Sequence, residues 1–174
     1  MTAPDPLNEA STASIIRRLR KGDAPALLAF YNGLSRASIR TFRPLRERTT
    51  LEVCEAIVGD NAADRGTRYD LAAWRAEAII GWSFLVGLDK AEPSLGLGVA
   101  DPFHGRGLGS ALLDRLLAWA RERTLARIYL IAVKDNERAV RLYGSRGFVV
   151  YGEFFDERDQ LPYLRMMAEL TGET

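Results

Sequence analysis

The sequence predicts a single α/β domain of the mixed (α+β) type, in which helices flank a mostly antiparallel sheet. A chain of 174 residues with 47% hydrophobic residues is long enough to bury one core without crosslinks. In the first half, short strand patterns follow one another directly, which is typical of an antiparallel meander. In the second half, strands and helices alternate, which predicts a right-handed crossover and one parallel strand pair. Together these patterns predict about six to seven strands and about four helices.

The domain is expected to begin where polar sequence gives way to an apolar strand. Residues 1–13 show no periodicity and are predicted to form a flexible tail, which places the single domain at 14–172. Asp23 can cap a helix that carries Pro25 in its first turn. The other elements expected in the first half are a strand at 14–19, a helix from about 50 to 58 that ends near Gly59, and strands at 69–74, 78–88 and 94–100.

A basic segment, residues 35–48, lies between the two helices of the first half. It interleaves arginines with apolar residues, and Pro44 discourages one continuous helix there. Such arginines usually form a solvated face, but they can also attract an acidic acceptor or line a site. The elements expected in the second half are a helix at 107–123, a strand at 127–133, a helix at 136–146 and strands at 148–153 and 161–170.

Composition excludes several classes of function. The chain has one cysteine, Cys54, and one histidine, so it can form neither an internal disulfide nor a His/Cys zinc site, and no metal is expected. No apolar run approaches the roughly 20 residues that span a bilayer, so we expect a soluble, cytoplasmic protein without a membrane partner. The net charge of +1 argues against nucleic acid as a partner.

The glycine-rich segment 104–110, His-Gly-Arg-Gly-Leu-Gly-Ser, follows a strand and begins a helix. Glycines at 105, 107 and 109 allow the backbone to approach a ligand, and the free N–H groups of the helix start favour a phosphate. The spacing fits neither the lysine-containing P-loop of nucleotide hydrolases nor the dinucleotide fingerprint. A tight strand-to-helix connection with no ligand is the alternative explanation of the glycines.

A second motif, Asn-Glu-Arg-Ala-Val-Arg-Leu-Tyr-Gly-Ser-Arg-Gly-Phe, occupies residues 136–148 after the next strand. Asn136 and Tyr143 are two helical turns apart, so they share one helix face with Ala139. This motif, paired with the glycine-rich segment, resembles the GNAT superfamily of acyl-CoA-dependent N-acyltransferases. The resemblance covers residues 94–155 and rests only on the order of elements upstream of them.

The resemblance implies acetyl-CoA as co-substrate and a primary amine of a small molecule or protein as acceptor. The glycine-rich loop would hold the pyrophosphate of CoA, the end of strand 94–100 would bond its pantetheine arm, and Asn136 would lie beside that arm. The sheet would splay open between this strand and strand 127–133. The implied binding residues are Val99, Ala100, His104, Gly105, Arg106, Gly107, Leu108, Gly109, Ser110, Asn136, Ala139 and Tyr143. His104 departs from the Gln or Arg usual in the family, which should alter affinity without abolishing it.

Acyl transfer needs an oxyanion donor, an acid for the departing thiolate and an unprotonated amine. Tyr143 matches the family's helix tyrosine and is the predicted acid, although it could instead only pack against the sheet. A backbone N–H near Val99 or Ala100 is the expected oxyanion donor. For the base, Asp70, Glu77, Asp89 and Glu92 are candidates that are also ordinary surface charges, and a chain of water molecules is the alternative.

Cys54 lies in an apolar stretch and is expected to be buried, which predicts direct transfer without an acyl-enzyme. A non-catalytic CoA-binding or sensor module of the same fold is the main alternative function. An arginine-rich nucleic-acid-binding protein is a weaker alternative, because it would need a clustered basic surface. A homodimer is possible, and the sequence identifies neither an interface nor the acceptor.

Overall fold

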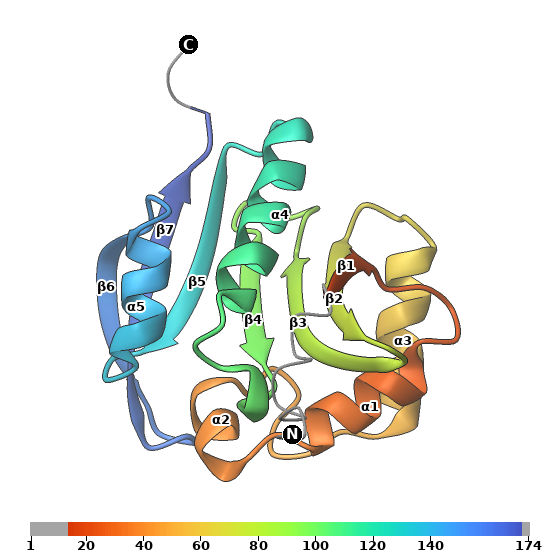
Figure 1. Cartoon of the computed structure of the whole chain (residues 1–174). Helices are drawn as coiled ribbons and strands as arrows, with labels where there is room; N and C mark the ends of the chain where they lie inside the picture. The colour runs from red at the N-terminus through yellow and green to blue at the C-terminus, as the bar shows by residue number, and fades with distance from the viewer. Residues whose placement is uncertain (1–13, 172–174) are drawn as a thin grey trace, which may run out of the picture.

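The computed structural model describes residues 14–171, so the tail expected at 1–13 lies outside the described residues. Within these described residues, seven strands form one sheet flanked by five α-helices, which confirms the predicted fold class (Figure 1). In chain order the elements are β1 Ile15–Arg18, α1 Ala24–Asn32, α2 Arg36–Thr41, α3 Leu51–Ala62, β2 Arg68–Arg75, β3 Ala78–Val86, β4 Ser94–Val99, a 3-10 turn Asp101–Phe103, α4 Leu108–Glu122, β5 Arg127–Val133, α5 Glu137–Gly144, β6 Val149–Asp156 and β7 Leu161–Glu169.

The strand order is β1-β2-β3-β4-β5-β7-β6, and all neighbours are antiparallel except β4 and β5. This pair is joined at a single register position, Ser94 opposite Tyr129. A backbone hydrogen bond of 2.9 Å from Tyr129 N to Pro93 O lies at the same end. Beyond it the two strands diverge, so the sheet is open toward their carboxyl ends.

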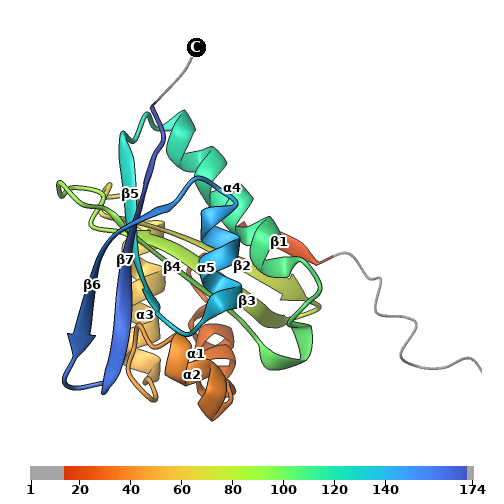
Figure 2. The same cartoon turned by 90° about the vertical axis from the view of Figure 1, so that its left-hand side faces the viewer.

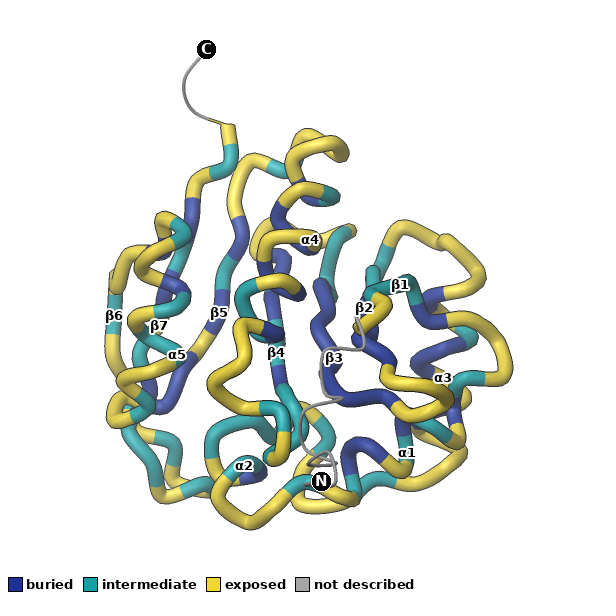
Figure 3. Tube along the Cα trace, viewed as in Figure 1, coloured by how far each residue is buried: buried dark blue, intermediate teal, exposed yellow. Residues whose placement is uncertain are grey.

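Two hydrophobic clusters cover the two faces of the sheet. Helices α4 and α5 lie on one side, which we call the α4 face (Figure 2). Leucines of α4 and Tyr143 of α5 pack there on alternate residues of β4, β5 and β7. On the other side, the α2 face, α1, α2 and α3 pack on β2 and β3 through residues such as Leu27, Ile39 and Cys54. Burial is greatest in the strands between these layers, whereas β6 is largely exposed (Figure 3). Among residues 14–171, no helix combines the length and apolarity needed to cross a membrane.

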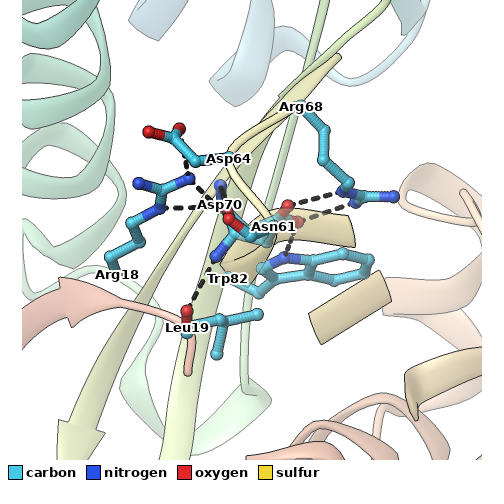
Figure 4. A network of polar contacts seen from close by, with 7 residues as sticks. All are labelled: Arg18, Leu19, Asn61, Asp64, Arg68, Asp70 and Trp82. Carbon is cyan, nitrogen blue, oxygen red and sulfur yellow. Dashed lines mark hydrogen bonds and ion pairs between the residues drawn. The ribbon is translucent and has the colours of Figure 1, made fainter. Parts of the chain in front are cut away.

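Helix α3 extends past Gly59, where the sequence predicted its end. Gly59 lies inside the helix, and the chain leaves it at Ala63 and Asp64, whose φ of 50° is left-handed. The extension places Asn61 in a buried polar network (Figure 4). Asn61 Nδ2 donates to Leu19 O at 2.8 Å, and its Oδ1 accepts from Asp70 N at 2.9 Å. Because these buried groups need partners, the tertiary contact determines where the helix ends.

Helix α2, which lies in the basic segment, was not predicted as a helix. Ser35 caps it, since its side chain accepts from Ser38 N, and Ile39 buries its apolar side. It has six residues, so its stability comes from contacts with the rest of the fold.

Candidate active site

A cavity of 580 Å³ lies at the opening between β4 and β5. It is lined from both the α4 face and the α2 face, so it spans the opening in the sheet, and we call it the passage. On the α4 face its walls are the start of α4 and the length of α5. On the α2 face the wall is formed by α2 with Leu34 before it and Phe42 after it. Its lining residues are Leu34, Ser38, Thr41, Phe42, Leu97–Val99, Phe103–Gly105, Gly107–Ser110, Ile131, Ala132, Asn136, Arg138, Ala139, Arg141–Tyr143, Ser145 and Arg146.

Strand β4 forms the floor of this passage, and its side chains alternate between the two faces. Leu97 and Val99 pack into the cluster under α4. Gly98 points the other way, toward Phe42, and a Cβ built on it would lie 2.3 Å from Phe42 Cδ1. Glycine at 98 therefore lets an aromatic ring rest directly on the backbone of β4.

The backbone of Val99 faces the opening. Val99 is opposite Gly81, and the neighbouring Ala100 N donates to Ile80 O at 2.9 Å. In an antiparallel ladder this makes Val99 and Gly81 a pair without mutual hydrogen bonds, so the N–H and C=O of Val99 point away from β3, toward β5. The sequence predicted an oxyanion donor at Val99 or Ala100. Because the Ala100 N–H already bonds Ile80 O, the Val99 N–H is the one of these two that remains free.

The carbonyl of Val99 is bound by a side chain from the glycine-rich loop. Its oxygen lies 2.7 Å from Nε2 of His104. A carbonyl can only accept, so Nε2 carries the proton in this contact. His104 thus fixes the loop to the end of β4, a structural role that its sequence position did not indicate.

The glycine-rich loop leads into α4 through left-handed backbone. Gly105 has a φ of 74° and Gly107 a φ of 78°, and the position of a Cβ on either would face open space. The first helical bond, 3.0 Å from Ala111 N to Gly107 O, leaves the amides of Leu108, Gly109 and Ser110 without helical partners. These N–H groups and the positive end of a 15-residue helix provide an anion site.

Helix α5 brings Asn136 and Tyr143 to the opposite wall. Asn136 is the N-cap, and its side chain accepts from Ala139 N at 3.3 Å. Tyr143 is 7% exposed, and its ring meets Phe148 edge-on at 5.7 Å. Burial raises the pKa of Tyr143 well above its ordinary value, which keeps the phenol protonated.

Helix α2 connects the carboxyl ends of the two diverging strands. Next to β4, Asp101 accepts from Ser35 N at 3.0 Å and from Ser38 Oγ at 2.9 Å. Burial alone would raise the pKa of Asp101, but these hydrogen bonds outweigh it and hold the pKa below its usual range. Next to β5, Arg40 binds Asp135 through two bonds of 2.9 and 2.7 Å. The basic segment is therefore held by hydrogen bonds to Asp101 on one side of the opening and by the Arg40–Asp135 ion pair on the other.

A second arginine of the segment reaches the β6–β7 turn. Arg43 Nη1 lies 2.9 Å from Asp159 Oδ1. Asp159 also accepts from the Tyr163 hydroxyl at 2.6 Å. Arg40 and Arg43 thus tie α2 and the chain after it to two separate loops.

The structure gathers most of the site residues predicted from the sequence around one cavity. Ala100 instead lines a separate hollow near α1, and Arg106 lies outside the lining, with its guanidinium 5.7 Å from the Phe103 ring. The predicted residues that line the cavity are Val99, His104, Gly105, Gly107, Leu108, Gly109, Ser110, Asn136, Ala139 and Tyr143.

The four carboxylates considered as bases lie elsewhere. Asp70 is fully buried and bound to Arg68 and to Trp82 Nε1, at 2.6 and 3.0 Å. Glu77 lines the separate hollow, while Asp89 and Glu92 are exposed in the β3–β4 loop. Among the residues that the structure describes, no aspartate or glutamate lines the cavity.

The sequence left open whether the basic segment 35–48 lines a site, and it did not identify the residues of the α2 wall, which are Leu34, Ser38, Thr41 and Phe42. One signal was available. Glycines alternate in β4 at 96 and 98, which indicates that another group approaches the strand closely on one face. The structure shows these groups to be the rings of Phe84 and Phe42.

Comparison with known proteins gives a consistent result. A model of the acetyltransferase (GNAT) family matches residues 30–148. An uncharacterized N-acetyltransferase of Mycobacterium bovis is 32% identical over 75 residues, which cover 42% of this chain and 48% of that protein. The match thus spans about half the length of this curated relative.

Solved structures share the fold over nearly the whole chain. An acetyltransferase of the GNAT family from Streptococcus pneumoniae has a TM-score of 0.76 and 26% identity, and the match covers 90% of this chain and 99% of that one. A putative acetyltransferase from Salmonella typhimurium, solved with acetyl-CoA, has a TM-score of 0.77 and 20% identity, with 94% and 97% covered. These matches confirm the resemblance predicted from the two motifs.

Proposed function

Because this chain belongs to the GNAT acetyltransferase family, we propose that it transfers the acetyl group of acetyl-CoA to a primary amine. The transfer is direct, without an acyl-enzyme. The observation that carries the proposal is the free Val99 N–H, which faces the same opening as the start of α4 and the protonated Tyr143.

The residues around the cavity fit acetyl-CoA. The left-handed glycines leave open space beside the free amides of α4, where a pyrophosphate would bind. The unpaired edge of β4 offers a main-chain donor to the pantetheine arm. Arg138, Arg141 and Arg146 also line the cavity, where Arg141 pairs with Glu137 and Arg146 with Asp114, and they would attract further phosphate charge. Acetyl-CoA supplies an activated thioester, so the protein has only to orient it and to move charge and protons.

Val99 has the position required of an oxyanion donor. Its N–H points into the opening between β4 and β5 and makes no hydrogen bond to β3. Negative charge grows on the acyl oxygen during attack, and a fixed amide donor stabilises that charge. Removing one such donor costs about 3 kcal/mol in known cases. The contact between His104 and the Val99 carbonyl holds the next peptide unit, Val99–Ala100, and so restrains the backbone on one side of this N–H.

Tyr143 is assigned as the proton donor to the departing thiolate. Its raised pKa keeps the proton on the phenol at any physiological pH. Within residues 14–171, no hydrogen bond engages its hydroxyl, although the residue lines the cavity. The hydroxyl is therefore free to donate within the site.

The amine loses its proton to water in this proposal, because no carboxylate among the described residues lines the cavity. Cys54 is fully buried in the cluster on the α2 face and lies outside the cavity lining. Burial also raises the pKa of its thiol, which disfavours the nucleophilic thiolate. Both facts support attack by the amine itself on the thioester.

The test combines calorimetric titration with acetyl-CoA and release of free thiol in the presence of a panel of amines. Wild type should bind acetyl-CoA and release thiol only when an amine is present. Tyr143→Phe should bind equally well but turn over about 100-fold more slowly, in line with the usual contribution of a general acid. Tyr69→Phe is the matched control, since Tyr69 stacks on Trp119 at 3.9 Å, away from the cavity.

Binding without thiol release on any amine would instead support a CoA sensor of the same fold, which the missing carboxylate base favours. No binding of acetyl-CoA would refute the proposal altogether. Equal turnover by Tyr143→Phe and wild type would leave an acetyltransferase in which Tyr143 only packs against the sheet.

A further inference from the structure

We propose that the acceptor is a primary amine with an apolar body, an arylalkylamine for example, that carries one positive charge. The inference rests on the proposed acetyl transfer and adds the class of acceptor. It follows from the end of the cavity that opens on the α2 face, where the chemistry differs from that of the α4 face.

The two ends of the passage can be assigned from the strands that border it. Leu97 and Val99 of β4 point to the α4 face, together with Tyr143 and the anion site. Gly98 points to the α2 face, as does Ile131 of β5, because its neighbours Leu130 and Ala132 belong to the cluster under α4. Phosphate-binding groups occupy one end only. The acceptor therefore enters from the end bordered by Gly98 and Ile131.

The wall at this end is apolar and rigid. Leu34, Phe42 and Ile131 contribute its aliphatic and aromatic surface. The ring of Phe42 rests on Gly98 and is surrounded by three aromatic rings, with centroid distances of 6.0 to 6.4 Å to Trp82, Tyr31 and Phe84. A fixed ring edge of this kind favours an apolar or aromatic ligand body over a hydrated one.

Two hydroxyl groups of α2 provide the polar contacts at this end, and both have already donated their hydrogens. Ser38 Oγ donates to Asp101 at 2.9 Å, and Thr41 Oγ1 donates to Ser38 O at 3.3 Å. Only their lone pairs remain for a ligand. Lone pairs accept hydrogen bonds from N–H groups, so these hydroxyls suit the N–H groups of an amine. They have no hydrogen left to donate to an oxygen of a ligand.

Charge at this end limits the acceptor to one ammonium group. No carboxylate among the described residues lines the cavity, and the neighbouring Asp101 and Asp135 are engaged by α2 itself. Arg40 is paired with Asp135 and Arg43 with Asp159, so these pairs offer no net negative charge to bind a further ammonium group. A second ammonium, as in a diamine or polyamine, would be desolvated here without a partner, which is costly.

The apolar character continues outside the cavity. Ile131 is 55% exposed, and Val149 and Tyr151 of β6 are 57% and 50% exposed. Tyr129 belongs to the same face of β5 as Ile131 and meets the Tyr151 ring edge-on at 6.0 Å. The body of an apolar acceptor can therefore extend over β5 once its amine is in the passage.

The experiment compares 2-phenylethylamine with 1,4-diaminobutane and spermidine at saturating acetyl-CoA. We expect kcat/KM for 2-phenylethylamine to be at least tenfold higher than kcat/KM for 1,4-diaminobutane or for spermidine. Thr41→Val removes a lone-pair acceptor with little change in shape and should lower kcat/KM for 2-phenylethylamine several-fold. Thr67→Val, near the opposite end of the sheet, is the control and should not.

A gain-of-function variant makes the test independent of lost activity. Thr41→Glu places a carboxylate in the lining and should raise kcat/KM for 1,4-diaminobutane while lowering it for 2-phenylethylamine. A wild-type preference for polyamines, or an unchanged preference in Thr41→Glu, would overturn the acceptor class and leave acetyl transfer intact. If acetyl-CoA binds but no amine of a broad panel is acetylated, the proposed function itself fails.

Discussion

The contact between Gly98 and Phe42 yields a quantitative prediction. A Cβ at position 98 would lie 2.3, 2.4 and 2.8 Å from three ring atoms of Phe42, distances that a real Cβ essentially never shows. Moving the ring aside, toward the cavity, would disturb its contacts with Tyr31, Trp82 and Phe84. Overpacking of this kind costs about 1 to 3 kcal/mol. Gly98→Ala should therefore lower the free energy of unfolding by about 2 kcal/mol.

The assay is equilibrium unfolding in urea, with Gly59→Ala as the matched control. Gly59 lies within α3, and its Cβ would have no neighbour within 4 Å, so alanine there should stabilise the protein by about 0.5 to 1 kcal/mol. In a Phe42→Ala background the clash is absent, and Gly98→Ala should cost much less than in wild type. Equal costs in both backgrounds, or no loss of stability in Gly98→Ala, would refute the proposed packing of the α2 wall.

Three further predictions concern the core and the acid. Ser83 is fully buried and its hydroxyl has no hydrogen-bond partner among residues 14–171. Ser83→Ala should therefore leave stability unchanged or raise it by about 1 kcal/mol in urea unfolding, and a clear loss of stability would contradict this. Asp70 is buried with Arg68 and Trp82, so Asp70→Asn should lower the free energy of unfolding by about 3 kcal/mol. Asp64→Asn is the control, because the Asp64 side chain is 61% exposed and its loss should change thermal stability little. Similar losses in both variants would contradict this account. Tyr143 must be protonated to act as an acid, and its raised pKa moves deprotonation above the ordinary tyrosine value of about 10. The pH profile of kcat should therefore show no fall due to Tyr143 up to about pH 10. A fall in kcat near pH 9 that Tyr143→Phe abolishes would contradict the assignment.

Local signals in the sequence were sufficient for the parts of the site that depend on local backbone chemistry. The glycine-rich segment predicted the start of α4, since glycines at 105 and 107 are required where φ is positive. The two-turn spacing of Asn136 and Tyr143 predicted that both lie on one side of α5, and both line the cavity. The opening between β4 and β5 came from the family resemblance, because strand patterns do not show where a pair diverges.

The features that were missed depend on contacts between distant residues. Helix α2 is held by Asp101 and Asp135, which are 66 and 95 positions from their partners Ser35 and Arg40. No periodicity within six residues can report such contacts. The choice between Val99 and Ala100 as amide donor likewise depends on the register of β4 with β3, which the sequence does not specify.

Amide hydrogen–deuterium exchange with and without acetyl-CoA tests the central claim most directly, namely that the opening between β4 and β5 is the acetyl-CoA site. The account predicts protection by acetyl-CoA at residues 97–99 and 105–110, with no change in α3, which lies on the far side of the sheet. Protection confined to other segments, or none at a concentration that saturates binding by calorimetry, would contradict it.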